Sequence, residues 1–162
     1  MNHFINLKKK LTVLITDDEY SYVSSIKKVF GRIFSLLNEN DLEFLVANDF
    51  EKTVNFFEKQ KIDIFICDID LNNSYKDGFF LIEYLNKNFD TNDTFICVHS
   101  NRIFSTDYIL DFGAHYYVQK PIGEDALIRI LKKYFEDFSK SIPLLKKERV
   151  IVIDDSEIYL NM

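Results

Sequence analysis

The chain passes from an apolar, β-branched segment directly into acidic residues at Leu11-Thr12-Val13-Leu14-Ile15-Thr16-Asp17-Asp18-Glu19. A short continuous apolar run of this kind predicts a strand that is buried on both faces of a sheet. Four more such runs follow, at residues 42–47, 62–67, 94–98 and 116–118. Between the runs, apolar residues recur at spacings of three and four, which predicts helices that bury one face. We expect these helices near residues 23–37, 49–58, 78–85, 106–113 and 127–138.

Five strands that alternate with five helices predict an α/β fold with a doubly wound parallel sheet, because the crossover between two parallel strands carries a helix. Strands covered by helices on both faces should be apolar almost throughout, as the runs at 11–15, 62–67 and 94–98 are apart from Thr12, Asp63 and Thr94. In an open sheet of this kind, ligands bind outside the carboxyl ends of the strands. The functional residues are therefore expected at those ends.

Charged and polar side chains stand at the predicted carboxyl ends of four strands. Asp17 and Asp18 follow the first strand, Asp68 the third, Ser100 the fourth and Lys120 the fifth. Three carboxylates in one crevice repel each other, so we expect a divalent cation among them, and Mg²⁺ suits an all-oxygen site that also receives a phosphoryl group. Lys120 adds a positive charge for an anionic ligand, and Ser100 adds a hydrogen-bond donor. Together these groups suit the transfer of a phosphoryl group onto an aspartate.

The same motifs resemble the receiver domain of two-component response regulators over about residues 10–138. The resemblance is carried by Leu14-Ile15-Thr16-Asp17-Asp18-Glu19, Ile66-Cys67-Asp68-Ile69-Asp70-Leu71, Asp77-Gly78, Val98-His99-Ser100-Asn101 and Gly113-Ala114-His115-Tyr116-Tyr117-Val118-Gln119-Lys120-Pro121. It implies a five-stranded parallel sheet of flavodoxin-like order 2-1-3-4-5, with helices on both faces.

The resemblance also implies roles for the acidic residues. Asp68 would be the phosphoacceptor, phosphorylated by a sensor histidine kinase or a phosphotransfer protein. Asp18, Asp68 and the backbone carbonyl of Asp70 would bind Mg²⁺ directly, and Asp17 would hold a metal-bound water. On this basis we expect a regulatory phosphoacceptor domain that is not an enzyme, and whose only catalytic activity is its own dephosphorylation.

The remaining roles implied by the resemblance concern the switch. Lys120 would pair with the phosphoryl group, and Ser100 would move toward it after phosphorylation. Tyr117 matches the aromatic residue that turns inward with that movement, and Lys120-Pro121 would be a cis peptide bond. The face formed by the fourth helix, fifth strand and fifth helix would then change, to control a downstream domain, a partner or a homodimer.

Three positions near the expected site differ from the commonest family pattern or add charge to it. Asn101 stands where a small residue usually follows the switch hydroxyl, and its larger side chain would narrow the entrance. Asp70 and Arg102 each lie two residues past a site residue. We expect them to pair across the mouth of the site and to tune the lifetime of the phosphoryl group.

Two alternatives to the signalling switch stay open at this point. Asp68 and Asp70 also resemble the nucleophile and general acid/base of haloacid-dehalogenase-type phosphatases, with Ser100, Lys120 and Asp154-Asp155 following in that family's order. Against this, 67 residues precede Asp68, whereas that nucleophile usually lies near the start of its domain, and Asp17-Asp18 is left unexplained. The other alternative is a receiver-like interaction module that works without phosphorylation.

The end of the chain echoes its first strand. Arg149-Val150-Ile151-Val152-Ile153-Asp154-Asp155 matches the pattern of residues 12–18, unless the match is a coincidence between two short strands. We therefore predict an N-terminal extension over 1–10, a receiver domain over 11–138, a linker over 139–148 and the first strand of a second, truncated receiver over 149–162. The parent protein would carry that further receiver and an output domain.

Composition limits the remaining function classes. Basic residues number 20 and acidic residues 26, for a net charge of −6, which argues against direct nucleic-acid binding. No apolar run approaches the roughly 20 residues that cross a membrane, and no signal peptide opens the chain. The only cysteines, Cys67 and Cys97, lie in apolar runs and are interpreted as small buried hydrophobic residues. These features favour a cytoplasmic protein.

Overall fold

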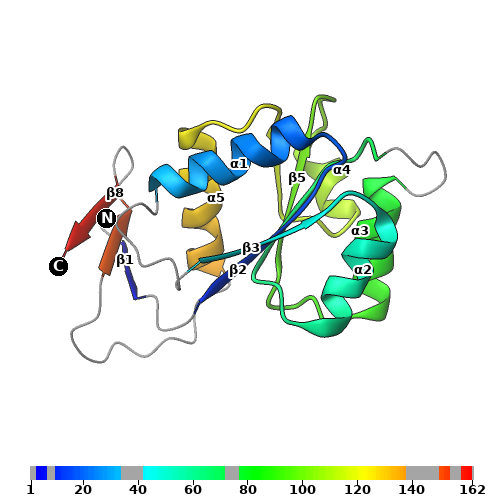
Figure 1. The fold of residues 1–162 in the computed structure, drawn as a ribbon, viewed down its shortest axis with the longest axis horizontal. Coiled ribbons are helices and arrows are strands. Elements are labelled where there is room, and N and C mark those ends of the chain that lie inside the picture. The colour runs from blue at the N-terminus through cyan, green and yellow to red at the C-terminus, as the bar shows by residue number, and fades with distance from the viewer. Residues whose placement is uncertain are drawn as a thin grey trace.

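The computed structural model describes residues 3–6, 10–33, 42–71, 77–137, 150–153 and 158–161 of the chain. Its main sheet contains the parallel strands β2 (Leu11–Thr16), β3 (Leu42–Ala47), β4 (Ile64–Cys67), β5 (Phe95–Ser100) and β6 (Tyr116–Gln119). The helices that alternate with them are α1 (Tyr20–Ile33), α2 (Phe50–Lys59), α3 (Gly78–Asn88), α4 (Thr106–Asp111) and α5 (Glu124–Asp137) (Figure 1). None of the helices within these residue ranges is long and apolar enough to cross a membrane.

The order of strands in the main sheet is β3-β2-β4-β5-β6. Counted along the chain from β2, this is the order 2-1-3-4-5, so the predicted fold class is confirmed. Residues of α1 and α5 cover one face of the sheet, and residues of α2, α3 and α4 cover the other. This order brings the carboxyl ends of β2, β4, β5 and β6 into one row along the edge of the sheet.

The predicted bounds differ from the structure mainly where polar residues belong to an element. α5 begins at Glu124 rather than at residue 127, because an acidic first turn suits the positive end of the helix dipole but adds nothing to the apolar pattern. β5 also continues past its apolar run, through His99 and Ser100, because these polar residues add nothing to the apolar pattern that predicted the strand. Residues 34–37, the predicted end of the first helix, lie outside the described residues.

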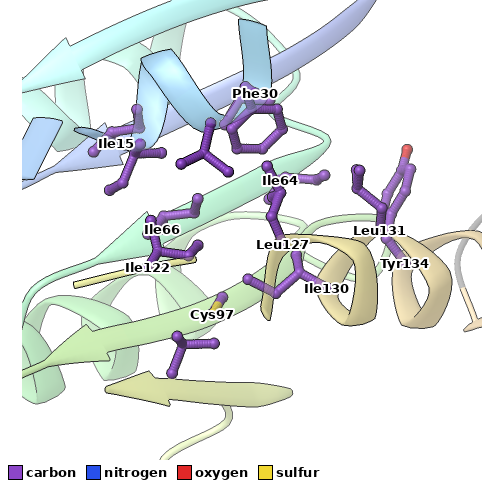
Figure 2. Packing of buried hydrophobic residues seen from close by; sticks show 14 of the residues in the cluster. Ile15, Phe30, Ile64, Ile66, Cys97, Ile122, Leu127, Ile130, Leu131 and Tyr134 are labelled. Carbon is purple, nitrogen blue, oxygen red and sulfur yellow. The ribbon is translucent and has the colours of Figure 1, made fainter. Parts of the chain in front are cut away.

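Side chains of the central strands alternate between two buried clusters. The cluster under α1 and α5 includes Ile15, Ile64, Ile66, Cys97, Phe30, Leu127 and Ile130 (Figure 2). The cluster on the opposite face includes Leu14, Phe65, Cys67, Ile96, Val98, Leu81 and Ile82. Because both faces are buried, β4 and β5 are apolar at every position until the carboxyl end, and β2 is too except at Thr12. Both cysteines are free and buried, on opposite faces of the sheet.

The start of α3 packs directly against the segment that follows β4. Asp77 caps the helix, because its carboxylate accepts a hydrogen bond from the Phe80 amide at 2.8 Å. The amide of Gly78 donates to the carbonyl of Ile69 at 2.9 Å. A Cβ atom at Gly78 would overlap the carbonyl oxygen of Asp68. The backbone of Asp68 is thus fixed by a contact that only glycine permits.

A separate small sheet contains β1 (His3–Asn6), β7 (Val150–Ile153) and β8 (Ile158–Asn161) in the order β1-β7-β8. Both of its strand pairs are antiparallel, and it lies beside the two chain termini (Figure 1). The N-terminal extension therefore contains a strand, and the apolar tail run forms β7. The predicted linker over 139–148 and Asp154-Asp155 lie outside the described residues. A second receiver starting at residue 149 stays a prediction.

His99, near the carboxyl end of β5, is the least satisfied of the buried polar side chains. It is 1% exposed, and neither ring nitrogen has a hydrogen-bond partner among the described residues. Burial, and then the positive charge of Lys120, lowers the pKa of His99 from its ordinary value of 6.5 to about 4. The imidazole is therefore neutral at pH 7.

Replacing Gly78 with alanine should destabilise the fold strongly, because the added methyl group would displace the backbone of Asp68. We expect a loss of at least about 2 kcal/mol in the free energy of unfolding. Gly31→Ala is the matched control, because nothing lies within 4 Å of a Cβ at that position in α1. That control should raise the free energy of unfolding by about 0.5–1 kcal/mol. Equal values for the two variants in urea titrations would contradict the packing described here.

His99→Val should remove part of the acid sensitivity of the fold. Because the folded pKa of His99 lies below its unfolded value of 6.5, the unfolded state binds more protons between pH 6.5 and about 4, and stability falls as the pH falls through that window. From pH 7 to pH 5, the wild type should lose about 2 kcal/mol more than His99→Val. Urea titrations in EDTA at both pH values measure this difference. Parallel losses in the two proteins would show that His99 does not titrate as a buried neutral group.

Candidate functional site

The backbone fixes where the acidic side chains leave the sheet. The last paired residues of β2 and β4 are Thr16 and Cys67. The next residue of β4, Asp68, donates its amide to the Thr16 carbonyl at 2.8 Å, and Asp17 donates its amide to the Ala47 carbonyl at 3.1 Å. Both aspartates therefore lie one position beyond the ladder on neighbouring strands, as the sequence predicts.

The alternation of the strands decides the face toward which each side chain points. Asp17 and Asp68 lie two residues beyond Ile15 and Ile66, which belong to the cluster under α1 and α5. Lys120 lies two residues beyond Val118 of the same cluster. A period of two therefore directs all three side chains to the α1/α5 side of the sheet edge. Residues from three different strands converge there.

Lys120 lies between the two aspartates. Its Nζ is 2.7 Å from Asp17 Oδ2 and 2.8 Å from Asp68 Oδ2, and the three side chains are 1–5% exposed. Burial raises the pKa of Asp17, and hydrogen bonds from Lys120 and from the Glu19 amide oppose that shift only in part. Burial by itself would lower the pKa of Lys120, but the hydrogen bonds to Asp17 and Asp68 raise it overall. Lys120 is therefore a charged ammonium group held in a buried site.

A third carboxylate completes an acidic cluster. Oxygens of Asp17, Asp18 and Asp68 lie within 4.8 Å of one another, and Asp18 is half-buried. The amide of Asp70 donates to Asp68 Oδ1 at 3.2 Å, and the amide of Glu19 donates to Asp17 Oδ1 at 2.9 Å. Three carboxylates against one ammonium leave an excess of negative charge. An all-oxygen cluster with this excess fits a hard divalent cation such as Mg²⁺.

Ser100 and Tyr117 meet at the backbone of Arg102. Ser100 is completely buried, and its Oγ accepts a hydrogen bond from the Arg102 amide at 3.2 Å. The Tyr117 hydroxyl donates to the Arg102 carbonyl at 2.7 Å. Tyr117 also packs edge-on against Phe104, at 5.8 Å between ring centroids. The two residues predicted to act as a switch are thus joined through one residue of the β5–α4 loop.

The rim of the site contains the charged pair expected from the sequence. Arg102 Nη1 lies 3.4 Å from Asp70 Oδ1, with side chains that are 58% and 54% exposed. A pair this exposed is screened by water and contributes little to stability. Asn101 is also exposed, and its Nδ2 donates to the hydroxyl of Tyr22 at 3.4 Å. The structure brings Asp70 and Arg102 together, whereas Asn101 contacts α1 instead of the acidic residues.

Sequence reasoning missed one neighbour of Lys120 and one of Asp17. The Tyr22 ring centroid lies 4.1 Å from Lys120 Nζ, and His99 Nδ1 lies 4.0 Å from Asp17 Oδ2. The alternation of β5 could have identified His99, since it follows Cys97 by two residues on the α1/α5 side. Tyr22 depends on how α1 crosses the sheet edge, and no sequence signal marks that crossing. The predicted cis bond between Lys120 and Pro121 is present.

Known proteins share both this sequence pattern and this fold. The family model of the response regulator receiver domain matches residues 13–132. An NtrX-like response regulator of Rickettsia bellii is 26% identical over 155 residues, and one of Rickettsia typhi is 28% identical over 153 residues. These alignments cover 93% and 92% of this chain but 30% of each relative. The chain therefore spans under a third of the length of these curated relatives.

Solved structures with the same fold are also response regulators. One from Thermotoga maritima has a TM-score of 0.61 and 22% identity, and the match covers 79% of this chain and 99% of that one. The chemotaxis response regulator CheY4 of Vibrio cholerae has a TM-score of 0.64 and 17% identity, with 78% and 99% covered. The matched residues 13–132 include every member of the acidic cluster, together with Ser100 and Lys120. This chain therefore belongs to the response regulator receiver domain family, whose members are phosphoacceptor signalling switches.

Proposed function

We propose that Asp68 is the phosphoacceptor of this receiver domain, and that a sensor histidine kinase or a phosphotransfer protein supplies the phosphoryl group. The ion pair between Lys120 Nζ and Asp68 Oδ2, at 2.8 Å, is the observation that carries the proposal. An ammonium that touches the acceptor oxygen is already in position for the negative charge that arrives there. The carboxylates of Asp17 and Asp18 also lie close enough to Asp68 for all three to share one cation.

The reaction follows from the two oxygens of Asp68. One carboxylate oxygen attacks phosphorus, so that an O–P bond forms while the N–P bond of the donor phosphohistidine breaks, and the electron pair of that bond leaves with the imidazole. The Asp70 amide holds Oδ1 at 3.2 Å, which fixes the orientation of the carboxylate. Lys120 balances the charge of the phosphoryl oxygens, and Asp17, at 2.7 Å, keeps the ammonium in place when Asp68 becomes an acyl phosphate.

We propose that Asp18, Asp68 and the backbone carbonyl of Asp70 hold Mg²⁺, and that Asp17 holds a water molecule of that ion. The excess of carboxylates over ammonium groups supports this assignment, because the cluster is uncompensated without a cation. When bound, Mg²⁺ would offset the negative charge on the transferring phosphoryl group.

The same proposal includes a readout through Ser100 and Tyr117. If Ser100 moves toward the phosphoryl group, its Oγ gives up the hydrogen bond from the Arg102 amide, and the Tyr117 hydroxyl is bonded to that same residue. Tyr117 lies on β6 between α4 and α5, and Tyr108 and Leu110 of α4 are 44% and 52% exposed. This α4–β6–α5 face would form a homodimer or contact a further receiver or output domain, and phosphorylation would shift the balance between its two states.

The central test is phosphorylation of Asp68 by a small phosphodonor. With acetyl phosphate and Mg²⁺, the chain should take up one phosphoryl group per molecule, and EDTA should abolish the uptake. Asp68→Asn should lose all labelling, whereas Asp70→Asn, which keeps the backbone groups of residue 70, should retain it. Intact-protein mass spectrometry and beryllofluoride binding provide the readout.

Two other results would contradict this function. Multiple turnover of a phosphomonoester would support the phosphatase alternative, in which Asp70 acts as the acid/base. Binding of neither acetyl phosphate nor beryllofluoride by the folded chain would support an interaction module that works without phosphorylation.

The pair formed by Asp70 and Arg102 should control how long the phosphoryl group lasts. Because the pair crosses the mouth of the site, Asp70→Asn or Arg102→Gln should admit water and speed dephosphorylation by about two- to five-fold. The double variant should be no faster than the faster single variant, because either change breaks the same contact. Rates that multiply in the double variant would show that the two residues act independently.

A further inference from the structure

Tyr22 makes a close contact with the ammonium of Lys120. Tyr22 is the third residue of α1, and its half-buried ring lies 4.1 Å from Lys120 Nζ, measured to the ring centroid. Aromatic faces attract cations electrostatically, and the attraction is strongest where the cation has lost its water. The Lys120 side chain is 1% exposed. Among the described residues, Nζ thus has three close neighbours: two charged carboxylates and one uncharged aromatic face.

Tyr22 is itself held in place from two sides. Its ring meets the ring of His99 edge-on, with centroids 5.9 Å apart and planes at 87°. Its hydroxyl accepts a hydrogen bond from Asn101 Nδ2 at 3.4 Å. Asn101 directly follows Ser100, so α1 is linked over Lys120 to the residue next to the switch hydroxyl.

We infer that Tyr22 is a positioning residue, whose ring holds the Lys120 ammonium for phosphotransfer to Asp68. The inference rests on the proposed function. When Asp68 becomes an acyl phosphate, Lys120 exchanges one carboxylate partner for phosphoryl oxygens, and its long side chain must stay directed at them. The ring of Tyr22 presents the same face to the ammonium before and after this exchange, so it limits the orientations that the side chain must search.

A merely structural role for Tyr22 predicts different behaviour. If Tyr22 only fills space between α1 and β5, any apolar side chain of similar size would serve, and the position of Lys120 would not depend on an aromatic ring. Tyr22→Phe keeps the ring and removes the hydroxyl, whereas Tyr22→Leu removes both. Comparing these variants separates the cation–ring contact from packing and from the bond to Asn101.

The experiment measures two quantities on the full chain with Mg²⁺. The first is the rate of labelling of Asp68 by acetyl phosphate, which should fall about three- to ten-fold in Tyr22→Leu and stay within about two-fold of wild type in Tyr22→Phe. The second is the chemical shift of the Lys120 ε protons, assigned with Lys120→Arg. The ring current should move these resonances upfield in the wild type and in Tyr22→Phe, but not in Tyr22→Leu.

Phe57→Leu is the matched control for loss of a ring. Phe57 is a half-buried residue of α2 that packs on Phe65 and Phe89, at 5.5 Å and 5.9 Å between centroids. It belongs to the cluster on the face of the sheet opposite to that of Lys120. This variant should label at the wild-type rate. If Tyr22→Leu does not fold, Tyr22→Met replaces it as a flexible side chain without a ring.

Several outcomes would overturn the inference. They are a wild-type labelling rate in Tyr22→Leu, equal slowing in Tyr22→Phe and Tyr22→Leu, equal slowing in Phe57→Leu, or Lys120 resonances that are not shifted in the wild type. Each of these outcomes is judged against a wild-type protein that acetyl phosphate labels at Asp68. A wild type that takes up no phosphoryl group at all would instead overturn the proposed function.

Discussion

A single buried ammonium holds two buried carboxylates at the edge of the main sheet. The backbone forces the carboxylates together, because Asp17 and Asp68 each lie one residue past the ladder on adjacent strands. Removing one partner from such a cluster leaves an uncompensated buried charge, which is far more costly than losing a surface ion pair. Lys120 directly follows β6, which lies beyond β5 in the sheet, and this strand order brings its Nζ to 2.7 Å from Asp17 Oδ2 and 2.8 Å from Asp68 Oδ2.

The charges in the same cluster do not balance. Asp17, Asp18 and Asp68 carry more negative charge than Lys120 can balance, and the raised pKa of Asp17 records that burial outweighs its hydrogen bonds. A structural ion pair would need only one carboxylate for one ammonium. Surplus carboxylates gathered around one ammonium fit the proposed site, which would take up a divalent cation and an anionic group together. The composition of the cluster therefore argues for phosphoryl chemistry independently of the family resemblance.

Sequence patterns predicted the features that depend on strong local periodicity and missed those that depend on packing between distant elements. The central strands and the acidic residues at their ends follow from continuous apolar runs that stop at Asp17 and Asp68. The contact between Tyr22 and Lys120 depends on the angle at which α1 crosses the sheet, which no local pattern records. Likewise, β7 matches the first strand in sequence, but its antiparallel partner β1 lies at the other end of the chain. Pairing across such a separation is decided by the folded structure and not by either segment.

The two sides of the sheet separate the residues proposed for the chemistry from those proposed for the switch. Asp17, Asp68 and Lys120 continue the residues that pack under α1 and α5, whereas Ser100 continues Val98 on the side of α3 and α4. On that second side, ring contacts join Tyr117, Phe104, Tyr108, Phe112 and Phe79 into one aromatic group. A signal from Asp68 of the kind proposed above would therefore have to cross the edge of the sheet to reach α4. The backbone of Arg102, bonded to both Ser100 Oγ and the Tyr117 hydroxyl, lies at that crossing. Because one peptide segment serves both bonds, the proposed displacement of Ser100 would also disturb the bond of Tyr117, and the ring contacts of the aromatic group would extend that disturbance to α3 and α4.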